Sequence, residues 1–161
     1  MSEAPSQDTP QQIFEIQKLY LKDVSFESPG VPEVFTGEWK PETNVQLGTE
    51  TRKLQNDVHE VSLNITVTTT MEKNTAYLVE LKQAGVFTLR GFNDAQLGHM
   101  LGSYCPNILF PFAREAIADL ISKGGFPGFL LAPVNFDALY SQHLQQAASQ
   151  DSTPDASPTA H

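Results

Sequence analysis

Few residues in this chain have the types and the spacing that catalysis or metal binding needs. The single cysteine, Cys105, lies between Tyr104 and Pro106, and no neighbour in the sequence suggests a base that would activate it. Thiols without such a base are mostly inert core residues, so no nucleophile is expected. The histidines lack metal-ligand spacing and an accompanying cysteine pair; they are His59, His99, His143 and His161. Zinc binding is therefore not predicted.

Nucleotide binding is not predicted either. The chain has no Gly-x-x-x-x-Gly-Lys-Ser/Thr loop and no Gly-x-Gly-x-x-Gly fingerprint. Its glycine cluster, at Gly124, Gly125 and Gly128, follows a helical pattern and does not open one. We therefore expect no cofactor, no catalytic residues and no enzymatic activity.

Two pairs of residues could instead form a binding surface. Asp23 and Glu27 are four residues apart in a strand-like segment, so they share a face and lie roughly 13 Å apart. Leu78 and Glu80 share a face of another predicted strand in the same way. Together in water, the two faces would make a flat acidic patch around one apolar residue, suited to a small basic partner. An ordinary solvated sheet face explains the pattern equally well.

An unusually apolar loop over residues 31–41 indicates a second possible binding surface. Aromatic side chains give a large contact area with little hydrogen-bond specificity, which suits the recognition of unfolded chains. Burial in an ordinary core is the competing interpretation. The residues that could line such a groove, with the loop facing the last helix, are Phe26, Val34, Phe35, Trp39, Phe136, Leu139 and Tyr140.

Four strands and then helices must position these residues. Two-residue alternation predicts strands over residues 14–27, 44–50, 58–71 and 75–88, with a tight turn at residues 72–74. In the first strand, the even positions form one apolar face: Phe14, Ile16, Tyr20, Val24 and Phe26. Short connections favour an antiparallel sheet, and helices that follow all the strands predict an α+β domain with the helices on one sheet face.

Three helical segments follow Gly91. Asn93 or Asp94 can cap the first, and Asn135 can cap the last. Pro106 and Pro111 are expected to bracket an apolar turn, after which Pro111 opens a new helix. The apolar stripe of that helix, which Gly124 and Gly125 should end, consists of Phe110, Ala113, Ile117, Leu120 and Ile121.

Length and composition set limits on the whole chain. Its 161 residues suit one domain, over residues 13–146, between polar tails at 1–12 and 147–161 that are expected to be disordered. A net charge of −9 argues against nucleic-acid binding. The N-terminus lacks a secretory signal pattern and no apolar run is long enough to span a bilayer, so we expect a cytoplasmic protein without membrane insertion.

Three segments resemble the SecB family of bacterial protein-export chaperones. Residues 104–115 read Tyr-Cys-Pro-Asn-Ile-Leu-Phe-Pro-Phe-Ala-Arg-Glu, residues 131–139 read Leu-Ala-Pro-Val-Asn-Phe-Asp-Ala-Leu, and residues 20–29 contain Lys-Asp-Val-Ser-Phe-Glu. The resemblance implies an ATP-independent holdase that assembles as a homotetramer, a dimer of dimers. Such a holdase keeps secretory precursors unfolded and delivers them to the SecA motor.

The resemblance also implies roles for individual residues. Asp23, Glu27, Leu78 and Glu80 match the family positions that dock the basic, zinc-bearing C-terminal tail of SecA. The lengthened, Pro-rich C-terminal tail departs from many relatives. A general or toxin-antitoxin-linked SecB-like holdase is the alternative within this class, and a small α+β enzyme or ligand carrier is the alternative outside it.

Overall fold

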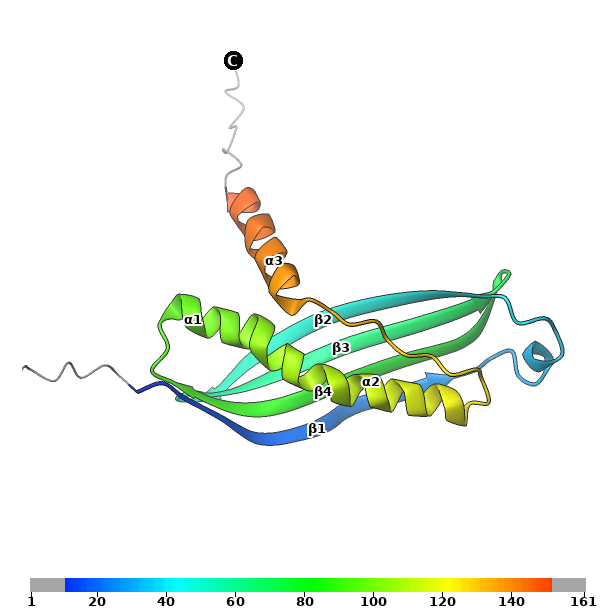
Figure 1. Cartoon of the computed structure of the whole chain (residues 1–161), viewed down its shortest axis with the longest axis horizontal. Helices are drawn as coiled ribbons and strands as arrows, with labels where there is room; N and C mark the ends of the chain where they lie inside the picture. The colour runs from blue at the N-terminus through cyan, green and yellow to red at the C-terminus, as the bar shows by residue number, and fades with distance from the viewer. Residues whose placement is uncertain (1–10, 152–161) are drawn as a thin grey trace, which may run out of the picture.

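The computed structural model describes residues 11–151, in which four long strands form one antiparallel sheet (Figure 1). The strands are β1 (Ile13–Glu27), β2 (Pro41–Gln55), β3 (Val58–Met71) and β4 (Asn74–Arg90). Their order in the sheet is β1-β4-β3-β2, so β1 and β2 are the edge strands. The predicted antiparallel α+β fold is confirmed, and β2 is longer than its short apolar pattern at residues 44–50 indicated.

One face of the sheet is covered by helices. After the 3-10 turn η1 (Glu33–Phe35), the helical elements are α1 (Asp94–His99), the π-helical η2 (Met100–Tyr104), α2 (Cys105–Lys123) and α3 (Phe136–Asp151). Figure 1 shows α1, η2 and α2 as one nearly continuous rod across the sheet, with α3 projecting from it. None of the helices between residues 11 and 151 has the length and apolar composition needed to cross a bilayer.

The core lies between α2 and the odd-numbered side chains of β3. Val61, Leu63 and Val67 are fully buried there. The predicted apolar stripe of α2 is confirmed. Leu120 is partly buried, and the other four members are buried: Phe110, Ala113, Ile117 and Ile121.

Strand β1 departs from the predicted alternation because it contains two β-bulges. The ladder with β4 skips Gln17 and Lys22, so each inserts one extra residue. Between the bulges, Leu19 and Leu21 lie opposite Gly85 and Gln83, on the helix-covered face. Tyr20 therefore lies on the outward face, and its predicted place beside Phe14 and Phe26 is wrong. A period-two pattern cannot reveal a bulge that reverses it and a second that restores it.

The expected start of a helix at Pro111 is also wrong. Asn93 forms a capping box with Gln96, and the helical rod then runs without a break to Lys123, with Pro111 inside α2. Pro106 lies near the start of α2, directly after the wider π-helical turn, so the hydrogen bond that proline cannot make is missing beside an already irregular turn of the rod. Pro111 leaves the carbonyl of Asn107 without its helical donor, but Asn107 is exposed to water.

The C-terminal part begins where Gly125, at φ +85°, ends the rod. Residues 126–135 then run back along the molecule to α3. Asn135 caps the start of this helix, because its side-chain Oδ1 accepts a hydrogen bond from the Ala138 N–H at 3.0 Å. Because α3 continues to Asp151, the boundary expected at residue 147 falls within a helix. The rest of the two expected tails, residues 1–10 and 152–161, lies outside the described residues.

Candidate functional site

The four predicted docking residues lie together on the outward, helix-free face of the sheet. Glu27 is directly opposite Leu78 in the β1–β4 ladder, and Ser25 is opposite Glu80. Asp23, opposite Lys82, completes the group. The second bulge turns the side chains of Asp23 and Glu27 to the outward face. The pairing of β1 with β4 then brings the two sequence segments side by side. We call Asp23, Glu27, Leu78 and Glu80 the acidic patch.

The acidic patch is exposed to water and keeps a net negative charge, although Lys82 lies opposite Asp23 in the ladder. Asp23, Glu27 and Glu80 are all exposed, and none of them forms an ion pair with another residue in the range 11–151. Leu78 is half-buried between them. Three free carboxylates around one apolar side chain can attract a cationic segment and bury one of its apolar groups.

A second charged cluster lies further along the same face. Glu60 of β3 accepts hydrogen bonds from the Tyr20 hydroxyl and from Lys22 Nζ, the latter at 2.8 Å, and Arg52 lies 3.9 Å away. Glu60 is only 8% exposed. The bonds from Lys22 and Tyr20 lower the pKa of Glu60, whereas burial and the bond to Glu60 raise the pKa of Tyr20 to about 12. Alternation alone did not indicate this cluster, because it placed Tyr20 on the opposite face.

The predicted groove residues fall into two separate groups. The first surrounds Phe126, whose ring lies 5.2 Å from that of Phe35, 5.6 Å from Trp39 and 6.5 Å from Phe26. Val34 packs partly buried against the same core. Phe126 is buried and centres the group, although the sequence indicated only that it follows two helix-ending glycines.

The second group holds the first turns of α3 against the helical rod, at the other end of the 126–135 segment (Figure 1). Phe136 is buried against Phe110, so it packs in the core of the protomer. The ring of Tyr140 packs on Gly98 and Gly102, and Leu139 remains exposed. The expected opposition of the loop to the last helix across one groove is therefore not found within one protomer.

Polar contacts strengthen the α3 attachment. His99 Nε2 lies 2.8 Å from Asp137 Oδ1, which also accepts a hydrogen bond from the Ser103 hydroxyl. Both hydrogen bonds lower the pKa of Asp137, and the bond from Ser103 has the larger effect. The serine bonds to the carboxylate and not to the imidazole, so the three side chains lack the relay of a hydrolytic triad.

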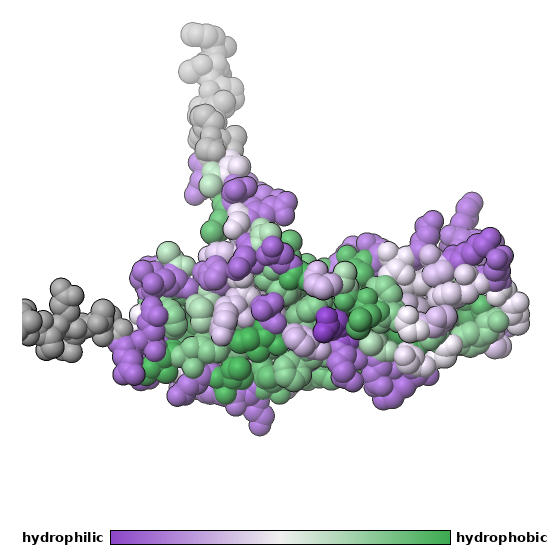
Figure 2. Space-filling model, in the orientation of Figure 1, coloured by the Kyte–Doolittle hydropathy of each residue, from purple (hydrophilic) through white to green (hydrophobic). Residues whose placement is uncertain are grey.

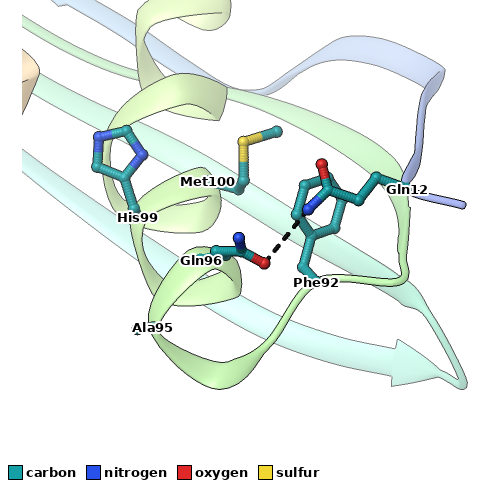
Figure 3. A pocket seen from close by; sticks show the side chains of 6 residues that line it. All are labelled: Gln12, Phe92, Ala95, Gln96, His99 and Met100. Carbon is teal, nitrogen blue, oxygen red and sulfur yellow. Dashed lines mark hydrogen bonds between the residues drawn. The ribbon is translucent and has the colours of Figure 1, made fainter. Parts of the chain in front are cut away.

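The cavity beside α1 offers little for small-molecule chemistry. Figure 3 shows this cavity of about 430 Å³, where Phe92 and Met100 are apolar walls and Gln12 Nε2 donates to Gln96 Oε1 at 3.3 Å. Among the described residues that line it, only His99 is titratable. Within residues 11–151, no three acidic, histidine or cysteine side chains gather as metal ligands would. Burial raises the pKa of the Cys105 thiol to about 12, which removes it as a nucleophile at neutral pH.

Comparisons with known proteins identify one family. The family model "Preprotein translocase subunit SecB" matches residues 7–147. The chain is 57% identical over 150 residues to the protein-export protein SecB of Methylococcus capsulatus, covering 93% of this chain and 96% of that one. It is 59% identical over 152 residues to the corresponding protein of Thioalkalivibrio sulfidiphilus, covering 91% and 90%.

A solved structure supports the fold. A SecB-like chaperone of Mycobacterium tuberculosis, in complex with a peptide from an antitoxin, superposes with a TM-score of 0.62. The superposition covers 75% of this chain and 90% of the M. tuberculosis chain, with 12% sequence identity. At that identity the likeness concerns the arrangement of strands and helices, not the ligands.

Proposed function

Because the chain belongs to the SecB family of preprotein translocase subunits, its role is that of a protein-export chaperone, and we propose that it delivers unfolded precursors to the SecA motor through the acidic patch. The observation that carries this proposal is the convergence of Asp23, Glu27, Leu78 and Glu80 on one exposed sheet face. The partner segment should be basic, because the patch presents three carboxylates that form no ion pair within residues 11–151. The proposed role belongs to the cytoplasm, where a precursor is held before export.

The docking test compares two charge reversals on the same sheet face. Glu80→Lys should weaken binding of the basic SecA tail by about tenfold or more, as should Asp23→Ala combined with Glu27→Ala. Glu50→Lys is the matched control, because Glu50 is exposed on the outward face of β2, opposite Ser62 and away from the patch. Calorimetric titration measures the affinities. Equal affinity of Glu80→Lys and Glu50→Lys would show that the patch serves only solubility.

Clients are proposed to bind along the two aromatic groups and the segment between them. Leu130, Phe35 and Leu139 are exposed large apolar residues on or beside this path. A long unfolded client that contacts several such weak sites gains affinity by a factor on the order of a hundred. No phosphate-binding loop is present in the sequence, so we propose that holding requires no ATP. Light scattering of an aggregating client tests this, and a nucleotide requirement would contradict it.

Self-association into a dimer of dimers is the third element of the proposal. On β1, an edge strand, Ile16, Leu21 and Val24 are 45%, 51% and 43% exposed although they lie on the helix-covered face of the sheet. Phe112 of α2 is 48% exposed. Figure 2 shows hydrophobic residues gathered where β1 and the helices meet. Covering these side chains with further copies removes apolar surface and an open edge. A native mass of one chain at micromolar concentration would refute this.

A further inference from the structure

We propose that the Lys22–Glu60–Tyr20 cluster positions the acidic patch, because it holds the β-bulge that sets the outward parity of Asp23 and Glu27. The inference rests on the proposed docking function and assigns a positioning residue, Lys22, that does not itself belong to the patch. Lys22 is the extra residue of the second bulge, since Leu21 pairs with Gln83 and Asp23 pairs with the adjacent Lys82. A shift of one residue in this register would turn the following β1 side chains to the other face.

The side chain of the bulged residue is anchored. Lys22 Nζ lies 2.8 Å from Glu60 Oε1, and Glu60 is on β3, two strands away. The Tyr20 hydroxyl donates to the other oxygen of the same carboxylate. Both side chains must pass over β4, where Ala84, opposite Tyr20 in the ladder, has only a methyl group. The buried carboxylate thus holds β1 on both sides of Leu21.

The other bulge is anchored in a parallel way. Gln17 is its extra residue, and Gln17 Nε2 donates to Thr88 Oγ1 at 2.6 Å. In each bulge, therefore, the inserted residue sends a polar side chain across the outward face to another strand, β4 for Gln17 and β3 for Lys22. Only the second bulge is directly followed by a patch residue, Asp23. Bulges are a recognised means of re-aiming side chains at functional sites.

Positioning and simple electrostatics make opposite predictions for Lys22. If Lys22 acted only through its charge, removing a cation beside the patch would strengthen binding of a basic partner. If Lys22 positions Asp23 and Glu27, its removal should weaken that binding although the patch becomes more negative. The substitution Lys22→Met keeps the apolar stem of the side chain and removes only the ammonium group.

The experiment measures binding kinetics of the basic SecA tail to the assembled full-length protein. Lys22→Met should bind about tenfold more weakly, mainly through faster dissociation, and the loss should persist at high salt, where charge effects are screened. Lys22→Arg, which can still donate to Glu60, should restore affinity. Lys18→Met is the matched control: Lys18 is exposed on the same face, opposite Val86, without an ion pair within the described residues, and should bind as tightly as wild type or tighter.

A second measurement reports on the strand itself. Hydrogen exchange at the backbone amides of residues 23–27 should become faster in Lys22→Met and remain as in wild type in Lys18→Met. Wild-type or tighter binding by Lys22→Met, with Asp23→Ala and Glu27→Ala together still weakening docking, would overturn the positioning role and leave the docking face intact. Unchanged docking in that double variant would overturn the docking face, and the positioning role with it.

Discussion

The ring of Tyr140 fills the space left by the absent side chain of Gly102: a Cβ atom at Gly102 would lie 2.5 Å from Cδ2 of Tyr140 and 2.7 Å from Cε2. At Gly98, one turn earlier, a Cβ would lie 2.6 Å from the Tyr140 hydroxyl oxygen. The aromatic side chain of α3 thus packs directly on the backbone of the helical rod, which explains two glycines inside a helical segment.

Replacing Gly102 by Ala should therefore destabilise the attachment of α3. Overpacking costs about 1–3 kcal/mol, which exceeds the gain of up to about 1 kcal/mol from the better helix propensity of Ala. Chemical denaturation and protease sensitivity of α3 measure the effect. In a Tyr140→Ala background only the gain in helix propensity remains, so Gly102→Ala should there stabilise the attachment of α3. Destabilisation of equal size in both backgrounds would contradict this packing account.

Phe126→Ala should cost about 3–5 kcal/mol of unfolding free energy, because it leaves a cavity within four surrounding rings. The nearest is Tyr77, at a centroid distance of 4.9 Å. Trp39, the only tryptophan in the sequence, contacts Phe126 and reports the change by fluorescence. Leu130→Ala, at a side chain 69% exposed in the same segment, should cost far less. Similar losses in the two variants would show that Phe126 is not the centre of the cluster.

The unfolding free energy should fall as the pH falls below about 6.5, in part because of His59. This side chain is 7% exposed, and its Nδ1 has no hydrogen-bond partner among the described residues. Burial, then Lys53, lowers its pKa from 6.5, against the opposing charge of Asp57. The folded state therefore binds fewer protons than the unfolded state, so the stabilisation is present above pH 6.5 and is lost as the pH falls toward the folded pKa.

The measurement follows denaturant unfolding from about pH 8 to about pH 5, below the ordinary His pKa. Replacing His59 by Leu should flatten the curve, whereas replacing the exposed His143 by Leu should leave it nearly unchanged. Glu60 and Asp137 have pKa values lowered from 4.5 and 3.8, so their loss of stabilisation falls at lower pH and does not interfere. A slope unaffected by His59→Leu would contradict the assignment.

Cys105 should resist thiol reagents in the native state. It is fully buried, and burial raises its thiol pKa to about 12, so the reactive thiolate is scarce at neutral pH. Labelling kinetics across a denaturant series should follow the unfolded population and reach the rate of a free thiol only after unfolding. Rapid labelling without denaturant would show that the core opens around α2.

The sequence by itself determined those features that depend on neighbours along the chain. The strand segments, the Asn93 and Asn135 caps, the glycine stop after Lys123 and the apolar stripe of α2 each follow from local spacing, and the structure confirms them. The shared face of Asp23 and Glu27 was predicted correctly because the second bulge lies before both residues. The segments that resemble the family indicated the class of protein, which residue spacing alone left open.

Only the tertiary structure decided which segments meet and which faces they present. The pairing of β1 with β4 assembles the acidic patch from residues more than fifty positions apart, and two bulges reverse and then restore the alternation of β1. Pro111 continues a helix because the packing of α2 on the sheet outweighs its lost hydrogen bond, whose acceptor residue, Asn107, is exposed to water. The two aromatic groups separate because Phe126 and Phe136 are buried at opposite ends of one extended segment. Each outcome depends on contacts between distant residues, whose energies a local pattern does not contain.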